Sequence, residues 1–160
     1  MAQNIHHFKN FSVVQDGVDI KLNLDRFSKQ YNDAQMKLDN MVMTYMKPFM
    51  PHQDGTFIAI TEGMSQAIAG TGKVIAAAPP EGRFLYEGKG MVDPATGSTW
   101  ARKGAKKVLV SQYKGKTNAK EKLNFSKKHN PKVTAHWFTA AKKAYGKNWI
   151  EVTKKTAGGG

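Results

Sequence analysis

A change in the spacing of apolar residues constrains the fold more than any other feature of the chain. Residues 18–24 alternate apolar and polar side chains without a break, which is typical of a half-buried strand. From Phe27 to Tyr45 the apolar residues are spaced by three or four, so they form one stripe on a helix predicted over 26–47. Pro48 ends this helix, because the residue before a proline avoids the helical region. A strand followed by a long helix predicts an α+β fold, with the helix packed on a sheet.

The remaining elements are predicted from shorter signals. Turn residues and β-propensity predict a strand at 56–60, a hairpin around Gly70-Thr71-Gly72, a helical turn at 83–87 and a strand at 107–111. A second helix is predicted to begin at Asn130-Pro131 and to end at Gly146, with a further short element over 148–155. Trp137 on its apolar face is expected to pack against the sheet or the first helix. The prediction is a small antiparallel sheet packed by a long N-terminal helix and a C-terminal helix.

The length of 160 residues predicts one domain with extensions. The expected divisions are an N-terminal arm at 1–17, a single α+β domain at 18–156 that includes an irregular basic insertion at 89–130, and a flexible tail at 157–160. The arm carries Phe8 and Phe11, which have no periodic partner within the chain. We therefore expect a neighbouring subunit to receive both rings.

The residue inventory gives little support to catalysis or cofactor binding. The chain has no cysteine, which excludes disulfides, thiolate zinc sites and cysteine nucleophiles. The segment 69–73 lacks the first Gly and the final Ser or Thr of a phosphate loop, so a hairpin turn is favoured there. His52 lies beside Asp54 without a placed nucleophile, and no histidine has the spacing of a metal ligand set. We expect no catalytic, cofactor-binding or metal-binding residues.

Positive charge is concentrated in the second half of the chain. Lys and Arg number 25 against 12 Asp and Glu, a net charge of +13. Residues 1–80 hold seven basic and seven acidic side chains, whereas 81–160 hold eighteen and five. This asymmetry predicts an acidic partner, and the excess of lysine favours sequence-independent attraction over base readout. A solubilising surface is the alternative. The predicted surface for DNA or an acidic partner consists of Arg102, Lys103, Lys106, Lys107, Lys114, Lys116, Lys127 and Lys128.

Three short segments stand in a recognisable order along residues 18–155. They are Pro51-His-Gln-Asp-Gly55, then Arg83-Phe-Leu-Tyr-Glu-Gly88, then 131–142 with Trp137-Phe138 at its centre. In this order they resemble motifs of the minor capsid proteins of tailed phages of Gram-positive hosts, a group similar to neck, head–tail joining and tail-completion proteins. The resemblance gives a structural role to Pro51, Asp54, Gly55, Tyr86, Gly88, Pro131, Trp137 and Ala141.

The resemblance implies a non-enzymatic structural protein of the virion, assembled in the host cytoplasm. Proteins of this kind form rings in the neck, between the connector of the DNA-filled capsid and the tail. We therefore expect a closed ring of this chain, six- or twelve-fold, that contacts head connector or stopper proteins and tail terminator proteins, with genomic DNA possible in its lumen. No apolar run approaches about 18 residues and the N-terminus lacks a secretory pattern, so neither a membrane partner nor export is expected. The alternative is a basic module that binds nucleic acid without sequence preference.

Overall fold

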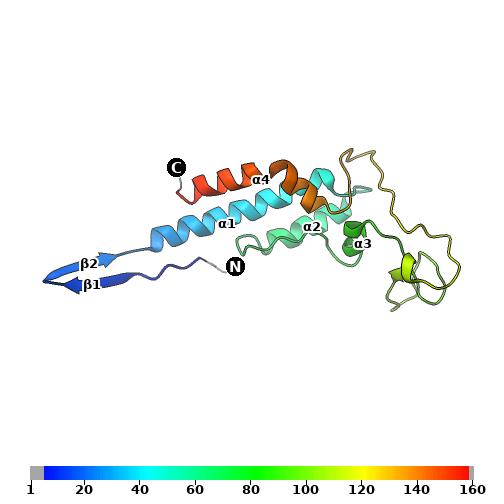
Figure 1. Ribbon diagram of the computed structural model, residues 1–160, viewed down its shortest axis with the longest axis horizontal. Coiled ribbons are helices and arrows are strands. Elements are labelled where there is room, and N and C mark those ends of the chain that lie inside the picture. Colours follow the sequence, from blue (N-terminus) through cyan, green and yellow to red (C-terminus); the bar gives the residue numbers. More distant parts are fainter. Residues whose placement is uncertain (1–5, 159–160) are drawn as a thin grey trace. The chain divides into compact units, whose positions relative to one another are not determined.

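A computed structural model describes residues 6–158 of the chain (Figure 1). Its helices are α1 (Asp25–Met46), α2 (Thr56–Gln66), α3 (Gly82–Glu87) and α4 (Trp137–Thr156), with 3₁₀ turns at Lys47–Phe49 and Val110–Gln112. Its strands form two antiparallel pairs, β1 (Phe11–Gln15) with β2 (Val18–Leu22) and β3 (Met91–Val92) with β4 (Val108–Leu109). The predicted α+β class is confirmed, with the long N-terminal helix and the C-terminal helix packed together. None of the helices in the described part is long and apolar enough to cross a membrane.

The described chain divides into two compact units whose segments alternate along the sequence. The first unit comprises residues 6–45, 62–75 and 141–158. The second unit comprises residues 46–61 and 76–140. Helices α1, α2 and α4 therefore contribute residues to both units, α1 with its last residue only.

In the first unit, α1 packs against α4. Tyr45 of α1 contacts the rings of Tyr145 and Trp149 of α4, with ring centroids 4.6 Å and 6.4 Å apart. The Trp149 side chain is buried, so its large apolar surface stabilises the helix pair. The bounds of α1 confirm the helix predicted over 26–47, and in this unit its observed packing partner is α4, since β1 and β2 hold no buried residue.

The buried face of α1 differs from the predicted apolar stripe. Ala34, Val42 and Met43 are buried, whereas Phe27 and Tyr31 are 50% and 41% exposed. The apolar period establishes that a helix forms, but it does not determine how much of the helix surface other segments cover. Part of the apolar surface of α1 therefore remains open.

Strands β1 and β2 form a hairpin closed by Asp16 and Gly17, which have φ values of 52° and 80°. Two left-handed residues give the tight turn that suits the twist of a hairpin. Every residue of both strands is exposed, so the strand predicted at 18–24 exists but is not half-buried. The division expected at residue 17 falls inside this hairpin, because β1 lies in the predicted arm.

Residues 6–10 run along the first turns of α1. The backbone N–H of Phe8 donates to Ser28 Oγ at 2.9 Å, and the Phe8 ring meets Tyr31 edge-on with centroids 5.3 Å apart. Phe8 thus has a ring partner within the chain, supplied by α1, which no periodic pattern in the sequence indicates. Residues 1–5 of the predicted arm lie outside the described residues.

The segment predicted as a hairpin around Gly70 and Gly72 is a turn without strands. The buried carboxylate of Asp39 accepts hydrogen bonds from the backbone N–H groups of both glycines, at 2.8 Å and 3.1 Å. A buried carboxylate requires such donors, and these bonds hold the turn against α1. The N–H groups of the two glycines are thus already hydrogen-bonded to a carboxylate, so they do not point toward a phosphate as they would in a phosphate loop.

The second unit is organised around Trp137, the first residue of α4. The Trp137 side chain is fully buried, and its indole N–H donates to the carbonyl oxygen of Ala76 at 2.7 Å. Phe57 and Tyr86 meet the indole edge-on, with centroids 5.8 Å and 4.8 Å away. The predicted burial of Trp137 is confirmed, but its ring partners here come from α2 and α3 instead of a sheet or the first helix.

Helix α2 replaces the strand predicted at 56–60. An Asp54 carboxylate oxygen accepts a hydrogen bond from the backbone N–H of Thr56 at 3.0 Å, at the start of the helix. Phe57 then packs on Trp137. The β-prone composition of this segment is therefore overruled by a helix start and by tertiary packing.

Helix α4 begins at Trp137, and not at Asn130-Pro131 as predicted. The Asn130 side chain does not cap this helix, because its amide donates to two backbone carbonyls of residues 47–50. The helix continues through Gly146, so the separate element expected after that glycine is the end of α4. Burial of Trp149 one turn later outweighs the cost of about 1 kcal/mol for a mid-helix glycine.

Two short predicted elements are confirmed. The helical turn predicted at 83–87 is α3, which ends at Gly88 in the left-handed conformation with φ 63°. The strand predicted at 107–111 is present as β4, shortened to Val108–Leu109.

Candidate functional site

The basic loop region, residues 89–130, contains little regular structure but is closely hydrogen-bonded. On one side of residues 88–92, the N–H of Val110 donates to the carbonyl of Gly90 at 3.1 Å, next to the β3–β4 pair. On the other side, the N–H of Gly90 donates to the carbonyl of Glu121 at 2.7 Å. The predicted loop is thus a scaffold of three adjacent backbone segments, which holds its side chains in defined positions.

Glycines allow this scaffold to close. A Cβ atom at Gly90 would lie 1.9 Å from the carbonyl oxygen of Lys120, a contact that no side chain can make. Cβ atoms at Gly97 and Gly115 would lie 2.7 Å and 2.6 Å from atoms of the Tyr113 side chain, so Tyr113 packs against both backbones. The contact at Gly90 is with backbone and requires glycine on steric grounds alone, whereas a side chain at Gly97 or Gly115 would have to displace the Tyr113 ring.

Asp93 fixes the turn that precedes the lysines. Its buried carboxylate accepts hydrogen bonds from the backbone N–H groups of Ala95 and Thr96, and from the backbone N–H and Nε of Arg102, all at 2.8–3.2 Å. The Arg102 side chain, followed by the N–H groups of Arg102 and Ala95, lowers the pKa of Asp93 well below its ordinary value. Arg102 is therefore an anchor of the turn, although its side chain remains 60% exposed.

The lysines of the predicted surface form no ion pair with an acidic side chain of residues 6–158. All are exposed except Lys107, which is half-buried. The second unit holds 14 basic and five acidic side chains, net +9, whereas the first holds 11 and seven, net +4. Most of the excess charge therefore belongs to the unit that contains the basic loop region. The lysines of the predicted surface that form no ion pair are Lys103, Lys106, Lys107, Lys114, Lys116, Lys127 and Lys128.

Trp100 is a functional candidate that the sequence reasoning missed. Its side chain is 85% exposed, although tryptophan is highly buried on average. It lies two residues before Arg102, in the turn that Asp93 holds. An exposed indole beside lysines can stack on a nucleic-acid base or enter a pocket of a protein partner. The sequence offers only a weak signal for this exposure, namely the polar neighbours Ser98 and Thr99.

The three motif segments come together in the second unit. Phe57 follows the first motif, Tyr86 lies in the second and Trp137 in the third, and both of the former contact the indole. The backbone N–H of His136 donates to the carbonyl of Tyr86 at 2.8 Å, which joins the second and third motifs. Segments that are far apart in sequence thus form one aromatic cluster.

The other motif residues act locally. Pro51, Asp54 and Gly55 lead into α2, and the N–H and hydroxyl of Thr56 lower the pKa of Asp54. Ala141 is buried within α4. The structural role that the resemblance gives to these residues is compatible with their places in the fold. Pro131 lies in the turn before α4.

The described residues contain no group of three or more His, Asp or Glu side chains that could hold a metal ion. The rings of His52 and His129 lie 4.8 Å apart, and His52 Nδ1 is buried without a hydrogen-bond partner. Two rings without a third ligand do not make a zinc site.

Comparison of the chain with protein-family models, curated proteins and solved structures finds no match. The chemistry that the basic loop region can perform is therefore read from its own geometry. That geometry is an ordered scaffold with lysines that lack acidic partners and one exposed tryptophan, which suits a polyanion or an acidic protein surface.

Proposed function

We infer that the chain is a structural virion protein that forms a ring in the neck of a tailed phage. The ring would join the connector of the DNA-filled capsid to the tail. The chain would act there without catalysis or cofactor, by presenting fixed surfaces to its neighbours.

The observation that carries this proposal is the aromatic cluster around Trp137. Three sequence motifs carry the resemblance to phage minor capsid proteins; segments of the second and third meet at this residue, and Phe57, two residues after the first, joins them there. Motifs that share a core must keep their order and spacing for a structural reason, whereas chance matches have no reason to meet. The cluster therefore supports treating the three motifs as one signature.

The charge distribution suits the same role. A ring places copies of the net +9 unit side by side, so the basic loop regions would form a positive rim or lumen. Lysine attracts phosphate without fixing a sequence register, which is what DNA in transit requires. An acidic connector surface would be attracted by the same charges.

Deletion of the gene in a tailed phage that encodes this chain tests the proposal. We expect DNA-filled heads and finished tails to accumulate unjoined, and electron microscopy of complemented virions to place a tagged copy in the neck. Normal joining without the protein, or a tag located elsewhere in the virion, would contradict the proposal.

The basic loop region is tested by neutralising four of its lysines together, Lys103, Lys106, Lys107 and Lys114, each to Gln. A matched control neutralises four exposed lysines of α4, Lys142, Lys143, Lys147 and Lys154. Head–tail joining by the first variant should be slowed most at low salt, because the Debye length shrinks to about 8 Å near physiological ionic strength. Equal loss in both variants would mean that net charge matters and the location does not.

A second function is favoured by Trp100, namely sequence-independent binding of nucleic acid by the free chain. An exposed indole beside unpaired lysines is the arrangement used to bind single strands. Binding would weaken steeply with salt, and Trp100→Ala would reduce affinity for single-stranded DNA more than for duplex DNA. Monomers that bind DNA in this way, combined with the absence of a ring, would favour this second function over the first.

A further inference from the structure

The hairpin of β1 and β2 carries an apolar face that nothing in the described chain covers. In an antiparallel pair, residues directly opposite one another share a face, and the register places Phe11 opposite Leu22 and Val13 opposite Ile20. Val18 lies on the same face, opposite Gln15. The five apolar side chains of this hairpin face are 42–59% exposed; they are Phe11, Val13, Val18, Ile20 and Leu22. An isolated two-stranded hairpin is marginally stable in water, so such a face requires a partner.

The hairpin is anchored at its base to the start of α1. At its base, the Asn10 side chain accepts a hydrogen bond from the N–H of Leu24 and donates to Asp25 at 3.4 Å. The preceding residues run along α1, where the N–H of Phe8 donates to Ser28 Oγ. Both chain connections are thus fixed at the N-terminal end of α1, and Figure 1 shows the hairpin extending from that end of the helix. A second copy of the chain can therefore reach the exposed hairpin face.

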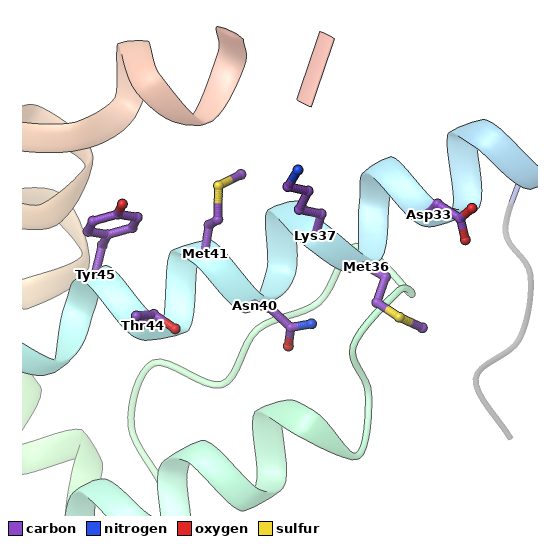
Figure 2. Close-up of a pocket in the computed structure, with 7 residues that line it drawn as sticks. All are labelled: Asp33, Met36, Lys37, Asn40, Met41, Thr44 and Tyr45. Atoms are coloured by element: carbon purple, nitrogen blue, oxygen red, sulfur yellow. The ribbon is translucent and has the colours of Figure 1, made fainter. Parts of the chain in front are cut away.

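A shallow groove on α1 has the matching properties. Figure 2 shows Lys37, Met41 and Tyr45 projecting toward α4 and Met36 projecting to the other side. It is lined by Asp33, Met36, Lys37, Asn40, Met41, Thr44 and Tyr45. From Asp33 to Tyr45 the helix rises about 18 Å, which is close to the length of a five-residue strand, about 17 Å. Methionine side chains adapt readily to an incoming apolar surface.

The distribution of charge favours a second copy of this chain as the occupant of the groove. The hairpin carries Asp16, Asp19 and Lys21, net −1, in a chain whose net charge is +13. Within the described residues, Asp16 has no ion-pair partner, and neither does Lys37 in the groove. Nucleic acid or an acidic protein would be repelled by the acidic tip of the hairpin. Another copy of this basic chain would attract it.

We propose that the hairpin face of one copy docks into the α1 groove of a second copy. Phe11, Val13 and Ile20 would contact Met36, Met41 and Tyr45 across the interface, and Asp16 would approach Lys37. The contact is heterologous, because each copy gives a hairpin and receives another. Repetition of such a contact generates a ring if the rotation closes and a filament if it does not. The proposal thus names the subunit contact that the proposed ring needs, and in that respect it rests on the proposed function.

Disulfide trapping tests this contact cleanly, because the chain has no cysteine of its own. One protein carries Val13→Cys and a second carries Met41→Cys, and the two are mixed under mild oxidation. Val14→Cys is the matched control for the first, because Val14 lies on the opposite face of the same strand and is 71% exposed. The Val13–Met41 heterodimer should form at least about tenfold faster than the Val14–Met41 heterodimer, since cysteines with Cα atoms more than about 7 Å apart do not bridge.

Three outcomes would overturn the proposal. Equal rates for the two mixtures would mean that the hairpin face does not select the groove. Faster formation of Val13→Cys homodimers than of the heterodimer would mean that hairpins pack on one another. A disulfide within a single chain of the double variant Val13→Cys/Met41→Cys would mean that the hairpin folds back onto its own helix.

Self-association provides an independent readout. Ile20→Lys puts a charge on the hairpin face and should raise the dissociation constant of self-association at least about tenfold, whereas Val14→Lys should change it less than about twofold. An equal effect of both variants in sedimentation experiments would contradict the proposal. The two proposals fail separately. If the Val13–Met41 disulfide forms but the protein is not found in the phage neck, the contact stands and the proposed function is refuted. If the protein is found in the neck but the disulfide does not form, only the contact is refuted.

Discussion

Trp137→Ala should be one of the most destabilising single substitutions in the chain. The side chain is fully buried, contacts Phe57 and Tyr86, and donates its indole N–H to the carbonyl of Ala76. Truncation of a buried tryptophan costs about 3–5 kcal/mol in lost transfer energy and cavity formation. The hydrogen bond adds to this, because the Ala76 carbonyl would lose its donor. We expect a loss of about 4 kcal/mol, a large part of the 5–15 kcal/mol typical of a folded domain.

Urea denaturation followed by far-UV circular dichroism measures this loss. Trp137→Phe, which keeps a ring but loses the N–H, should cost about 1–3 kcal/mol, and it gives a measurable value if the alanine variant does not fold. Trp100→Ala is the matched control, because the same substitution at an 85% exposed position should stay within about 0.5 kcal/mol of wild type. A cost below about 1 kcal/mol for Trp137→Ala, or an equal cost at Trp100, would refute the argument that this cluster forms the core of the second unit.

Two further predictions concern the scaffold of the basic loop region. Gly90→Ala should destabilise by about 1–3 kcal/mol, since its Cβ would meet the Lys120 carbonyl, whereas Gly63→Ala in α2, with open space around it, should stabilise by up to about 1 kcal/mol; chemical denaturation compares the two. Because Arg102 lowers the pKa of Asp93, the stability that this carboxylate contributes is complete above its ordinary pKa of 3.8 and is lost as the pH falls below it. The difference in unfolding free energy between wild type and Asp93→Asn should therefore shrink between pH 7 and pH 3, and a constant difference would contradict the assigned pKa shift.

Local signals predict the elements whose stability is mostly local. The stripe from Phe27 to Tyr45 predicts α1 nearly to the residue, and Gly88 ends α3 as its left-handed conformation requires. The strand at 18–24 is also predictable, because alternation is a property of the strand itself. What alternation cannot reveal is the absence of a cover, which is why the hairpin face was expected to be half-buried and is open instead.

Predictions fail where a distant residue decides the local structure. Asp39 binds the N–H groups of Gly70 and Gly72 and so prevents the hairpin that their turn chemistry favours. Asn130 is a residue type that commonly caps helices, but its side-chain amide donates instead to the backbone carbonyls of Lys47 and Met50, which are far away in sequence. The same holds for the candidate site. Lysine content predicts a basic surface, whereas the exposure of Trp100 follows from a turn that the buried Asp93 carboxylate organises.

Salt should act in opposite directions on the two kinds of contact that the chain offers. The acidic tip of the hairpin is attracted locally to Lys37 of a second copy, but whole copies of a +13 chain repel one another. Added salt screens this larger net repulsion and should strengthen self-association through the apolar hairpin face and the α1 groove. The unpaired lysines of the basic loop region attract an acidic partner, and added salt weakens that attraction. An acidic partner that neutralises the net +9 unit would therefore also promote self-association at low salt, which couples assembly to partner binding. Sedimentation across a salt series, with and without a short DNA duplex, should show self-association rising with salt for the free chain and falling with salt for the mixture. The same slope in both series would mean that the two contacts are independent.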